Sequence, residues 1–196
     1  MRRLIVILTL LVTSSLSVVH AQDDRTQTRP SKVRVPVPVE QIDVGDGDTV
    51  TIRWGEGDAE RIRILGIDTP ETSNIHHNLP LDQAFGRQAT AFARGAFATA
   101  TEVELLRADK MDGYGRTLGY LFVNGKNYSA LIVSARLAAE SVSHYGDNGF
   151  PEESEVVMEA ARAAGPVPFE PPFQFRRRMR EITDWMRDEG MLQEKD

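Results

Sequence analysis

Two runs of alternating apolar and polar residues, joined by a short turn, place the strongest constraint on how this chain folds. Residues 50–54 and 61–67 each direct every second side chain to the same face, as a β-strand does. Residues 55–58, which include two glycines, supply the turn between them. The pattern predicts a β-hairpin with one apolar face, and that face needs a core to cover it.

Further patterned segments extend this hairpin into a small domain. Residues 35–39 alternate but contain two prolines, which favours an edge strand or the start of a strand. Additional strands are predicted over residues 102–106 and 118–123, helices over 82–100, 128–137 and 152–164, and a loop over 143–151. We therefore expect an α+β chain that is mostly β, a five-stranded OB-fold barrel with three helices and a C-terminal tail helix.

The N-terminal segment has the composition of a secretory signal. Two arginines precede an apolar run, and small residues lead to Ala21. An uncleaved membrane anchor is the alternative, but the run is shorter than the roughly 20 residues that span a bilayer. We expect residues 1–21 to be a cleaved signal peptide of an exported protein, periplasmic or secreted, with no stable membrane association afterwards. The chain has no cysteine, so packing rather than disulfides must stabilise it.

The segments that flank the predicted domain, residues 35–165, differ from it in composition. Residues 22–34 are polar and aperiodic and indicate a disordered linker. Residues 166–196 form a proline-rich linker followed by an amphipathic helix. The apolar face of this helix is made by Phe175, Met179, Ile182 and Met186, and its other sides carry Arg176, Arg177, Arg178 and Arg180. We expect the apolar face to pack on the barrel or on a partner, with phosphate binding by the arginines as the alternative.

The net charge limits the kinds of nucleic-acid contact that are open to the chain. Lys and Arg number 23 and Asp and Glu number 29, for a net charge of −6. Proteins that coat nucleic acid neutralise phosphates with clustered basic side chains. The composition therefore disfavours bulk coating but leaves room for a local site.

An acidic turn precedes the first strand of the hairpin. Asp46 and Asp48 lie two residues apart, so both carboxylates can face one cation as hard oxygen ligands. The alternative is an ordinary Asx turn. The segment is not an EF-hand loop, because Val50 and Thr51 stand where that loop needs an acid and a glycine.

Two further charged segments follow in the predicted barrel. Asp68 ends the second strand of the hairpin and Glu71 comes just after it, where helix capping is the alternative interpretation. Arg116 follows the turn 112–115, and a plain hairpin turn with a surface arginine is the alternative there.

The barrel can bring Asp48, Asp68, Glu71, Arg63 and Arg116 together. Two carboxylates for a divalent cation, a third as base and two guanidinium forks suit attack of water on a phosphodiester.

The three motifs together resemble the staphylococcal nuclease-like, or thermonuclease, family. The resemblance runs from about residue 39 to 164 and rests on residues 44–50, on 63–72, and on 114–116 with Leu118 and Tyr120. It implies an OB-fold barrel with three helices and a Ca²⁺-dependent phosphodiesterase acting on DNA and RNA. Members cut the P–O5′ bond and leave 3′-phosphate ends, so the implied partner is a nucleic acid.

The resemblance also implies roles for individual residues. The metal set comprises Asp48, Asp68 and the carbonyl of Thr69, with Asp46 holding metal-bound water. The catalytic set comprises Glu71 as general base and Arg63 and Arg116 as phosphate-binding groups. Tyr114 matches a tyrosine that contacts a nucleotide phosphate, and Tyr145 is the candidate for a second substrate-binding tyrosine.

The chain departs from the family pattern at three places. Gly113 stands where a lysine assists phosphate binding, and Tyr145 with His144 replaces a pair of tyrosines. The loop 73–81 carries His76 and His77 instead of lysines. Two other functions are consistent with parts of the pattern, namely a non-catalytic module that binds nucleic acid or protein and an exported Ca²⁺-binding structural module. The complete set of acids and arginines favours the enzyme.

Overall fold

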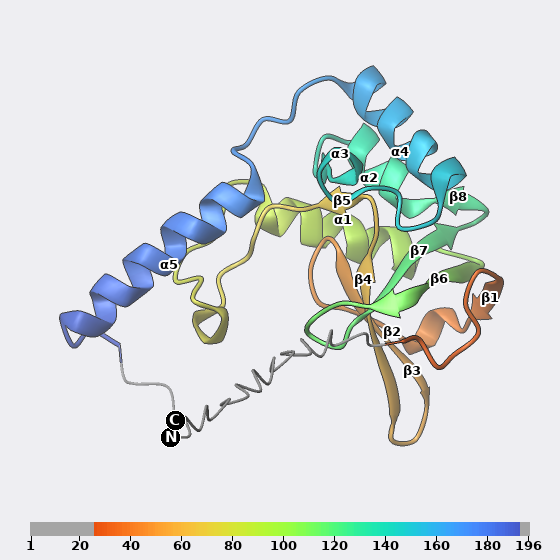
Figure 1. Cartoon of the computed structure of the whole chain (residues 1–196), viewed down its shortest axis with the longest axis horizontal. Helices are drawn as coiled ribbons and strands as arrows, with labels where there is room; N and C mark the ends of the chain where they lie inside the picture. The colour runs from red at the N-terminus through yellow and green to blue at the C-terminus, as the bar shows by residue number, and fades with distance from the viewer. Residues whose placement is uncertain (1–25, 193–196) are drawn as a thin grey trace, which may run out of the picture.

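The computed structural model describes residues 26–192, so the predicted signal peptide lies outside the described residues. The strands are β1 (Arg34–Val37), β2 (Ile42–Val44), β3 (Thr49–Gly55), β4 (Asp58–Ile64), β5 (Ile67–Asp68), β6 (Val103–Met111), β7 (Thr117–Val123), β8 (Lys126–Asn127) and β9 (Ala139–Glu140). The helices are α1 (Gly86–Ala98), α2 (Tyr128–Ser134), α3 (Val142–Tyr145), α4 (Pro151–Ala164) and α5 (Pro172–Asp188), with 3-10 turns η1 (Val39–Gln41) and η2 (Ile75–His77). Figure 1 shows their arrangement.

The main sheet is built around the predicted hairpin. Its strand order is β1-β6-β7-β4-β3-β2, with β8 added to β7. Strands β4 and β7 pair in parallel and the other neighbours along the path pair antiparallel. The sheet curls into a half-barrel, which confirms the predicted α+β, mostly β, OB-fold-like architecture. The barrel is less closed than predicted, because no pairing joins β1 to β2 within the described residues.

The core follows the alternation seen in the sequence. In β4, Ile62 and Ile64 are buried, while Arg61, the residue before Ile62, is exposed. Helices α1, α2 and α4 cover the sheet with small and large apolar side chains. Representative buried residues are Val50, Ile52, Ala89, Ala93, Phe97, Leu105, Leu121, Tyr128, Ile132 and Val157. None of the described helices is long and apolar enough to cross a membrane.

The predicted disordered linker is ordered in its described part, residues 26–34. Gln27 donates a backbone hydrogen bond to the carbonyl of Asp109, and Lys32 donates one to the carbonyl of Arg107. Arg29 pairs with Asp58 at the start of β4. Disorder was the wrong prediction here because contacts with β6 and the hairpin, rather than local periodicity, fix this segment.

Several element boundaries also differ from the prediction, among them the end of α2, which is Ser134 rather than residue 137. Helix α1 begins at Gly86 rather than at residue 82, because Phe85 has a left-handed φ of 73°, which a right-handed helix does not accommodate. The predicted loop 143–151 begins with the short helix α3.

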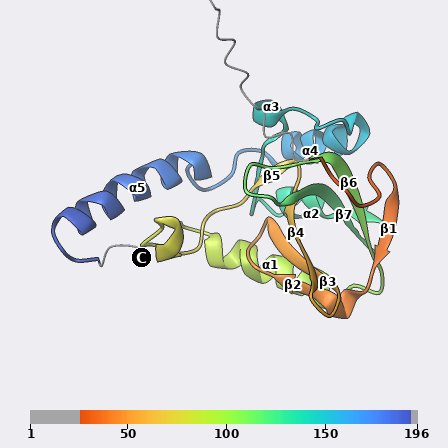
Figure 2. The ribbon, with the colours of Figure 1, turned by 60° about the horizontal axis from the view of Figure 1, so that its bottom comes forward.

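Helix α5 lies outside the barrel. Its apolar face forms a small separate cluster, in which Phe175, Met179 and Ile182 pack with Leu79. Leu79 belongs to the segment between β5 and α1, and Figures 1 and 2 show α5 beside that segment. The predicted amphipathic helix is therefore present, but its apolar face packs on the β5–α1 segment and not on the barrel core.

Candidate active site

The acidic turn between β2 and β3 is held against the end of β5. The backbone N–H of Asp48 donates to the Asp46 carboxylate at 3.0 Å, and the Tyr128 hydroxyl donates to the Gly47 carbonyl at 2.8 Å. A Cβ atom at Gly47 would lie 2.7 Å from the Thr69 methyl group. Only glycine allows the turn to approach this closely, so the turn places Asp48 beside Thr69.

The carboxylate of Asp48 is buried and fully engaged. Its Oδ2 atom accepts hydrogen bonds from the Thr69 N–H and hydroxyl, both at 3.0 Å, and Oδ1 accepts one from the Thr49 hydroxyl at 3.1 Å. Burial alone would raise the pKa of Asp48, but the Arg63 guanidinium and the Thr69 hydrogen bonds lower it. Asp48 is therefore ionised at neutral pH. Thr69 holds this acid in place, and the role of its carbonyl as a ligand stays a prediction.

Arg63 joins the two predicted metal ligands. Its guanidinium lies 3.3 Å from Asp48 Oδ2 and 3.4 Å from Asp68 Oδ1. It also donates to the carbonyls of Ile64 and Ile67 at 2.9 Å each. These backbone contacts fix Arg63 at the end of β4, where it holds both carboxylates on one side of the barrel.

Two further acids of the cluster ionise less readily. Burial and then the charge of Asp48 raise the pKa of Asp46 to about 7. Burial also raises the pKa of Glu71, a change that the hydrogen bond from Arg176 partly offsets and the charges of Asp48 and Asp68 reinforce. Raised pKa values in a charged cluster are typical of functional sites. Glu71 can therefore exchange a proton closer to neutral pH than an exposed glutamate.

The predicted set omits one residue of this cluster, Arg176 of α5. Its two terminal nitrogens bind the two oxygens of Asp68 at 2.9 and 3.0 Å, and one of them binds Glu71 Oε1 at 2.5 Å. Although burial opposes it, these carboxylates raise the pKa of Arg176 further. The sequence placed Arg176 on the polar side of a tail helix, and an excess of acids over arginines in the predicted site is the signal that a partner was missing.

Arg116 lies next to the cluster with a carboxylate partner of its own. Its Nε atom donates to Asp112 at 2.6 Å, and a terminal nitrogen lies 3.5 Å from the Thr49 hydroxyl. The Thr49 hydroxyl also donates to Asp48, so Thr49 links Arg116 to the four clustered acids, and Arg116 forms no ion pair with these acids itself. Tyr114 is 86% exposed, and its ring lies 5.6 Å from the Arg116 guanidinium. Tyr114 is therefore open to a ligand from solvent, whereas the Arg116 side chain is 21% exposed and is paired with Asp112.

Tyr145 lies at the end of α3, which follows the second, two-stranded sheet. Strand β9 pairs with β5, with Ala139 opposite Asp68, and α3 follows directly. Tyr145 is exposed and its ring meets that of His144 edge-on at 4.5 Å. Of the other histidines, His76 and His77 lie exposed on η2.

The charges and oxygens of the cluster set what it could hold. Four carboxylates, those of Asp46, Asp48, Asp68 and Glu71, share the guanidinium groups of Arg63 and Arg176. In residues 26–192, no group of three acidic or histidine side chains is arranged to hold a metal ion by itself. Arg63 and Arg176 stand among the carboxylates. Asp48 and Asp68 remain two hard oxygen donors of the kind that Ca²⁺ prefers, and the surplus of negative charge fits a divalent cation.

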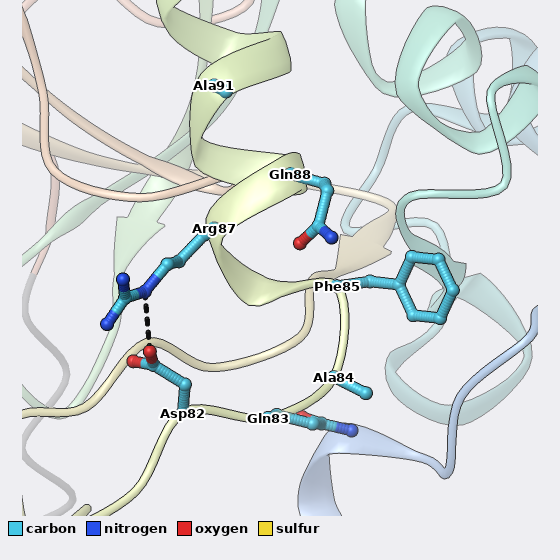
Figure 3. A pocket seen from close by; sticks show the side chains of 7 residues that line it. All are labelled: Asp82, Gln83, Ala84, Phe85, Arg87, Gln88 and Ala91. Carbon is cyan, nitrogen blue, oxygen red and sulfur yellow. Dashed lines mark hydrogen bonds and ion pairs between the residues drawn. The ribbon is translucent and has the colours of Figure 1, made fainter.

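Gln83 ties Glu71 to the tail. Its Oε1 accepts from the Glu71 N–H at 3.1 Å, while its Nε2 donates to the carbonyl of Glu170 at 2.7 Å. Figure 3 shows Gln83 beside the ribbon of the tail, at the edge of a hollow of about 440 Å³ at the start of α1. Gly86, the first residue of α1, also lies against Glu71, because a Cβ atom there would lie 2.2 Å from the Glu71 carbonyl oxygen. The backbone of Glu71 is thus fixed from both sides.

Comparisons with known proteins match about half of this chain. Residues 61–165 match the model of the family described as "Staphylococcal nuclease homologue". Over 94 residues the chain is 35% identical to the Thermonuclease of Staphylococcus intermedius, covering 47% of this chain and 53% of that protein. It is 32% identical over 98 residues to the Thermonuclease of Staphylococcus hyicus, covering 50% and 55%. It is also 31% identical over 94 residues to the SPbeta prophage-derived endonuclease YokF of Bacillus subtilis (strain 168), covering 47% and 30%.

The matched region is the one that contains Arg63, Asp68, Glu71 and Arg116, while the acidic turn and α5 lie outside the family match. The chain spans about half the length of the two thermonucleases and less of the endonuclease.

Proposed function

Because this chain belongs to the family of staphylococcal nuclease homologues, we propose that it is a nuclease that hydrolyses phosphodiester bonds in DNA, RNA or both. The observation that carries the proposal is the cluster of acids and arginines. Arg63 forms ion pairs with Asp48 and Asp68. Arg176 forms ion pairs with Asp68 and Glu71. The packing of the apolar core does not account for this concentration of charged groups. A nucleic-acid phosphate, by contrast, needs cationic neutralisation and a base for water.

We propose further that Ca²⁺ is the cofactor and that Asp48 and Asp68 hold it. Bound there, Ca²⁺ would neutralise the surplus charge of the acids and polarise the scissile phosphate. The oxygen-only donor set supports Ca²⁺ over softer metals, which prefer sulfur or imidazole. Asp46, close enough to Asp48 to bond its N–H, would hold a water of the hydrated cation.

The residues of the chain carry the remaining steps. A carboxylate oxygen of Glu71 accepts a proton from the attacking water, whose oxygen forms a bond to phosphorus while the P–O5′ bond breaks. The 5′ oxygen takes up a proton from solvent water as it leaves, and the other product keeps the 3′-phosphate. Arg63 and Arg116 donate to the phosphoryl oxygens on which negative charge accumulates. The exposed Tyr114 and Tyr145 contact the substrate.

An assay of cleavage tests this proposal. The purified protein is incubated with single-stranded DNA, duplex DNA and RNA, with Ca²⁺ or with a chelator, and the product ends are identified. We expect cleavage only with Ca²⁺ and products with 3′-phosphates. Cleavage that persists after chelation would contradict the cofactor, and binding without cleavage would favour a non-catalytic nucleic-acid-binding module.

We also propose that the protein is exported after loss of residues 1–21. The basic start, the apolar run and the small residues before Ala21 support this proposal. Mass spectrometry of the protein recovered from the producing cells and their medium tests it. We expect a mature N-terminus at Gln22 in the exported fraction, and an intact leader on all of the protein would contradict cleavage.

A further inference from the structure

The first turns of α5 cover the acids on which the proposed chemistry depends. We propose that α5 is an intramolecular competitor of the metal: Arg176 occupies Asp68, and with it Glu71, until a divalent cation held by Asp48 and Asp68 displaces it. The inference rests on the proposed function, since it concerns the same acids. It adds a control on cation binding that resides in the chain outside the matched family region.

The contacts of Arg176 are those of a ligand that fills a binding site. The two terminal nitrogens take one oxygen each of Asp68, so both oxygens of this acid are already used. The same guanidinium binds Glu71 at 2.5 Å. An arginine fork matches a carboxylate bidentately and stays charged at all accessible pH values. Asp68 therefore cannot offer its oxygens freely to a cation while Arg176 is bound.

Contacts on both sides of the site position this arginine. The Phe173 ring stacks on His144 of α3, with centroids 6.2 Å apart and planes within 5°. On the other side, Phe175 and Met179 pack with Leu79 of the β5–α1 segment. Gln83 holds the Glu170 carbonyl just before the helix. The start of α5 thus reaches from α3 to the β5–α1 segment, with Arg176 directed between them at Asp68 and Glu71.

The arrangement is reversible in physical terms. The anchoring cluster is separate from the barrel core and has few buried members, so the barrel does not depend on it. Arg176 is only partly covered, with 29% of its side chain exposed. A long flexible side chain of this kind can withdraw to solvent without unfolding anything else. Cation and arginine compete for the same oxygens, so each weakens the binding of the other.

Calorimetric titration of the protein with CaCl₂ tests the proposal. The variants are Arg176→Gln and, as a matched control, Arg177→Gln, which removes the same charge from an exposed position of the same helix. We expect Arg176→Gln to bind Ca²⁺ about tenfold more tightly than the wild type, because charge-assisted hydrogen bonds no longer have to be broken. Arg177→Gln is expected to stay within about twofold of the wild type.

Thermal unfolding with and without Ca²⁺ provides a second readout and checks that the variants fold. Loss of Arg176 is expected to lower the melting temperature in the chelator, and Ca²⁺ is expected to raise it by more than in the wild type.

Equal affinities in all three proteins, or weaker binding by Arg176→Gln, would overturn the competition while leaving Ca²⁺ binding intact. If no protein binds Ca²⁺, the cofactor in the proposed function and the competition both fail.

Discussion

Two charge clusters, one near each end of β4, differ in how completely their charges are matched. Glu60 of β4 accepts hydrogen bonds from Arg107 Nε and a terminal nitrogen at 2.8 Å each, from the Thr117 hydroxyl at 2.8 Å and from Trp54 Nε1 at 2.7 Å. These bonds outweigh burial and lower its pKa. Near the other end of β4, burial and neighbouring acids raise the pKa values of Asp46 and Glu71.

The difference distinguishes charged groups that stabilise the fold from charged groups that await a ligand. The Glu60–Arg107 cluster has a donor for each direction around the carboxylate, so its charge stabilises the fold without a ligand. The cluster of Asp46, Asp48, Asp68 and Glu71 has more negative charge than Arg63 and Arg176 supply. Such a surplus costs stability and is maintained where a cation or substrate completes the site.

The largest effect is expected at Arg63, which serves both fold and chemistry. Arg63→Gln leaves Asp48 buried without its cationic partner and removes a donor to the phosphate. We expect the cleavage rate to fall by a factor on the order of a hundred or more, and the free energy of unfolding to fall by roughly 3 kcal/mol.

Rate assays and urea unfolding measure the two losses, with Arg61→Gln, an exposed arginine of the same strand, as the control. An Arg63 variant as active as that control would remove Arg63 from the mechanism.

At Glu60 the effect is expected in stability alone. Glu60→Gln leaves Arg107, which is 3% exposed, without a charged partner, and we expect a loss of roughly 3 kcal/mol in the free energy of unfolding. The Ca²⁺-dependent cleavage rate, measured well below the melting temperature, should stay close to that of the wild type. The exposed Glu102→Gln serves as the control and should change stability by less than about 0.5 kcal/mol.

The pH dependence of this loss has a definite sign. The folded pKa of Glu60 lies below its usual value of 4.5, so its stabilisation is present above that value and disappears as the pH falls through the lowered pKa. The gap between wild type and Glu60→Gln in urea unfolding should therefore close in acid. A gap that is constant with pH would contradict the ionised role of Glu60.

The smallest effect is expected at Asp46, and its sign is opposite. Its folded pKa of about 7 lies above the usual 3.8, so the protonated form favours the fold and that stabilisation is lost as the pH rises through 7. Asp46→Asn keeps an acceptor for the Asp48 N–H and removes this dependence.

In Ca²⁺-free buffer at pH 8 we expect Asp46→Asn to match the wild type or exceed it by about 1 kcal/mol or less. Asp43→Asn, at an exposed ion pair, is the control. A clear loss of stability on Asp46→Asn would show that the charge of Asp46 is needed by the fold.

Much of the fold and most of the acids were predictable because the signals are local. Alternation fixes which side of β3 and β4 faces the core, and short spacings place Asp46, Asp48, Asp68 and Glu71 at strand ends. The half-barrel then brings these ends together through the pairing of β3 with β4.

The parts that were not predictable depend on contacts between distant segments. Arg176 reaches Asp68 across 108 positions of the chain, and no local pattern shows which residue of a tail helix will do so. The ordering of residues 26–34 depends on Arg107, which donates to the Pro30 carbonyl as well as to Glu60. Polar composition alone indicates disorder in this segment. Composition does not reveal the backbone hydrogen bonds that the segment makes with β6.

The most direct test of the central claim is the rate of DNA and RNA cleavage by Glu71→Gln at saturating Ca²⁺. It is compared with the wild type and with Glu56→Gln, an exposed glutamate in the β3–β4 turn. The account predicts a fall on the order of a hundredfold or more for Glu71→Gln, with unchanged unfolding behaviour and a wild-type rate for the control. A Glu71→Gln protein that cleaves as fast as the wild type would contradict the account, because the cluster of acids would then lack the base that makes it a catalytic site.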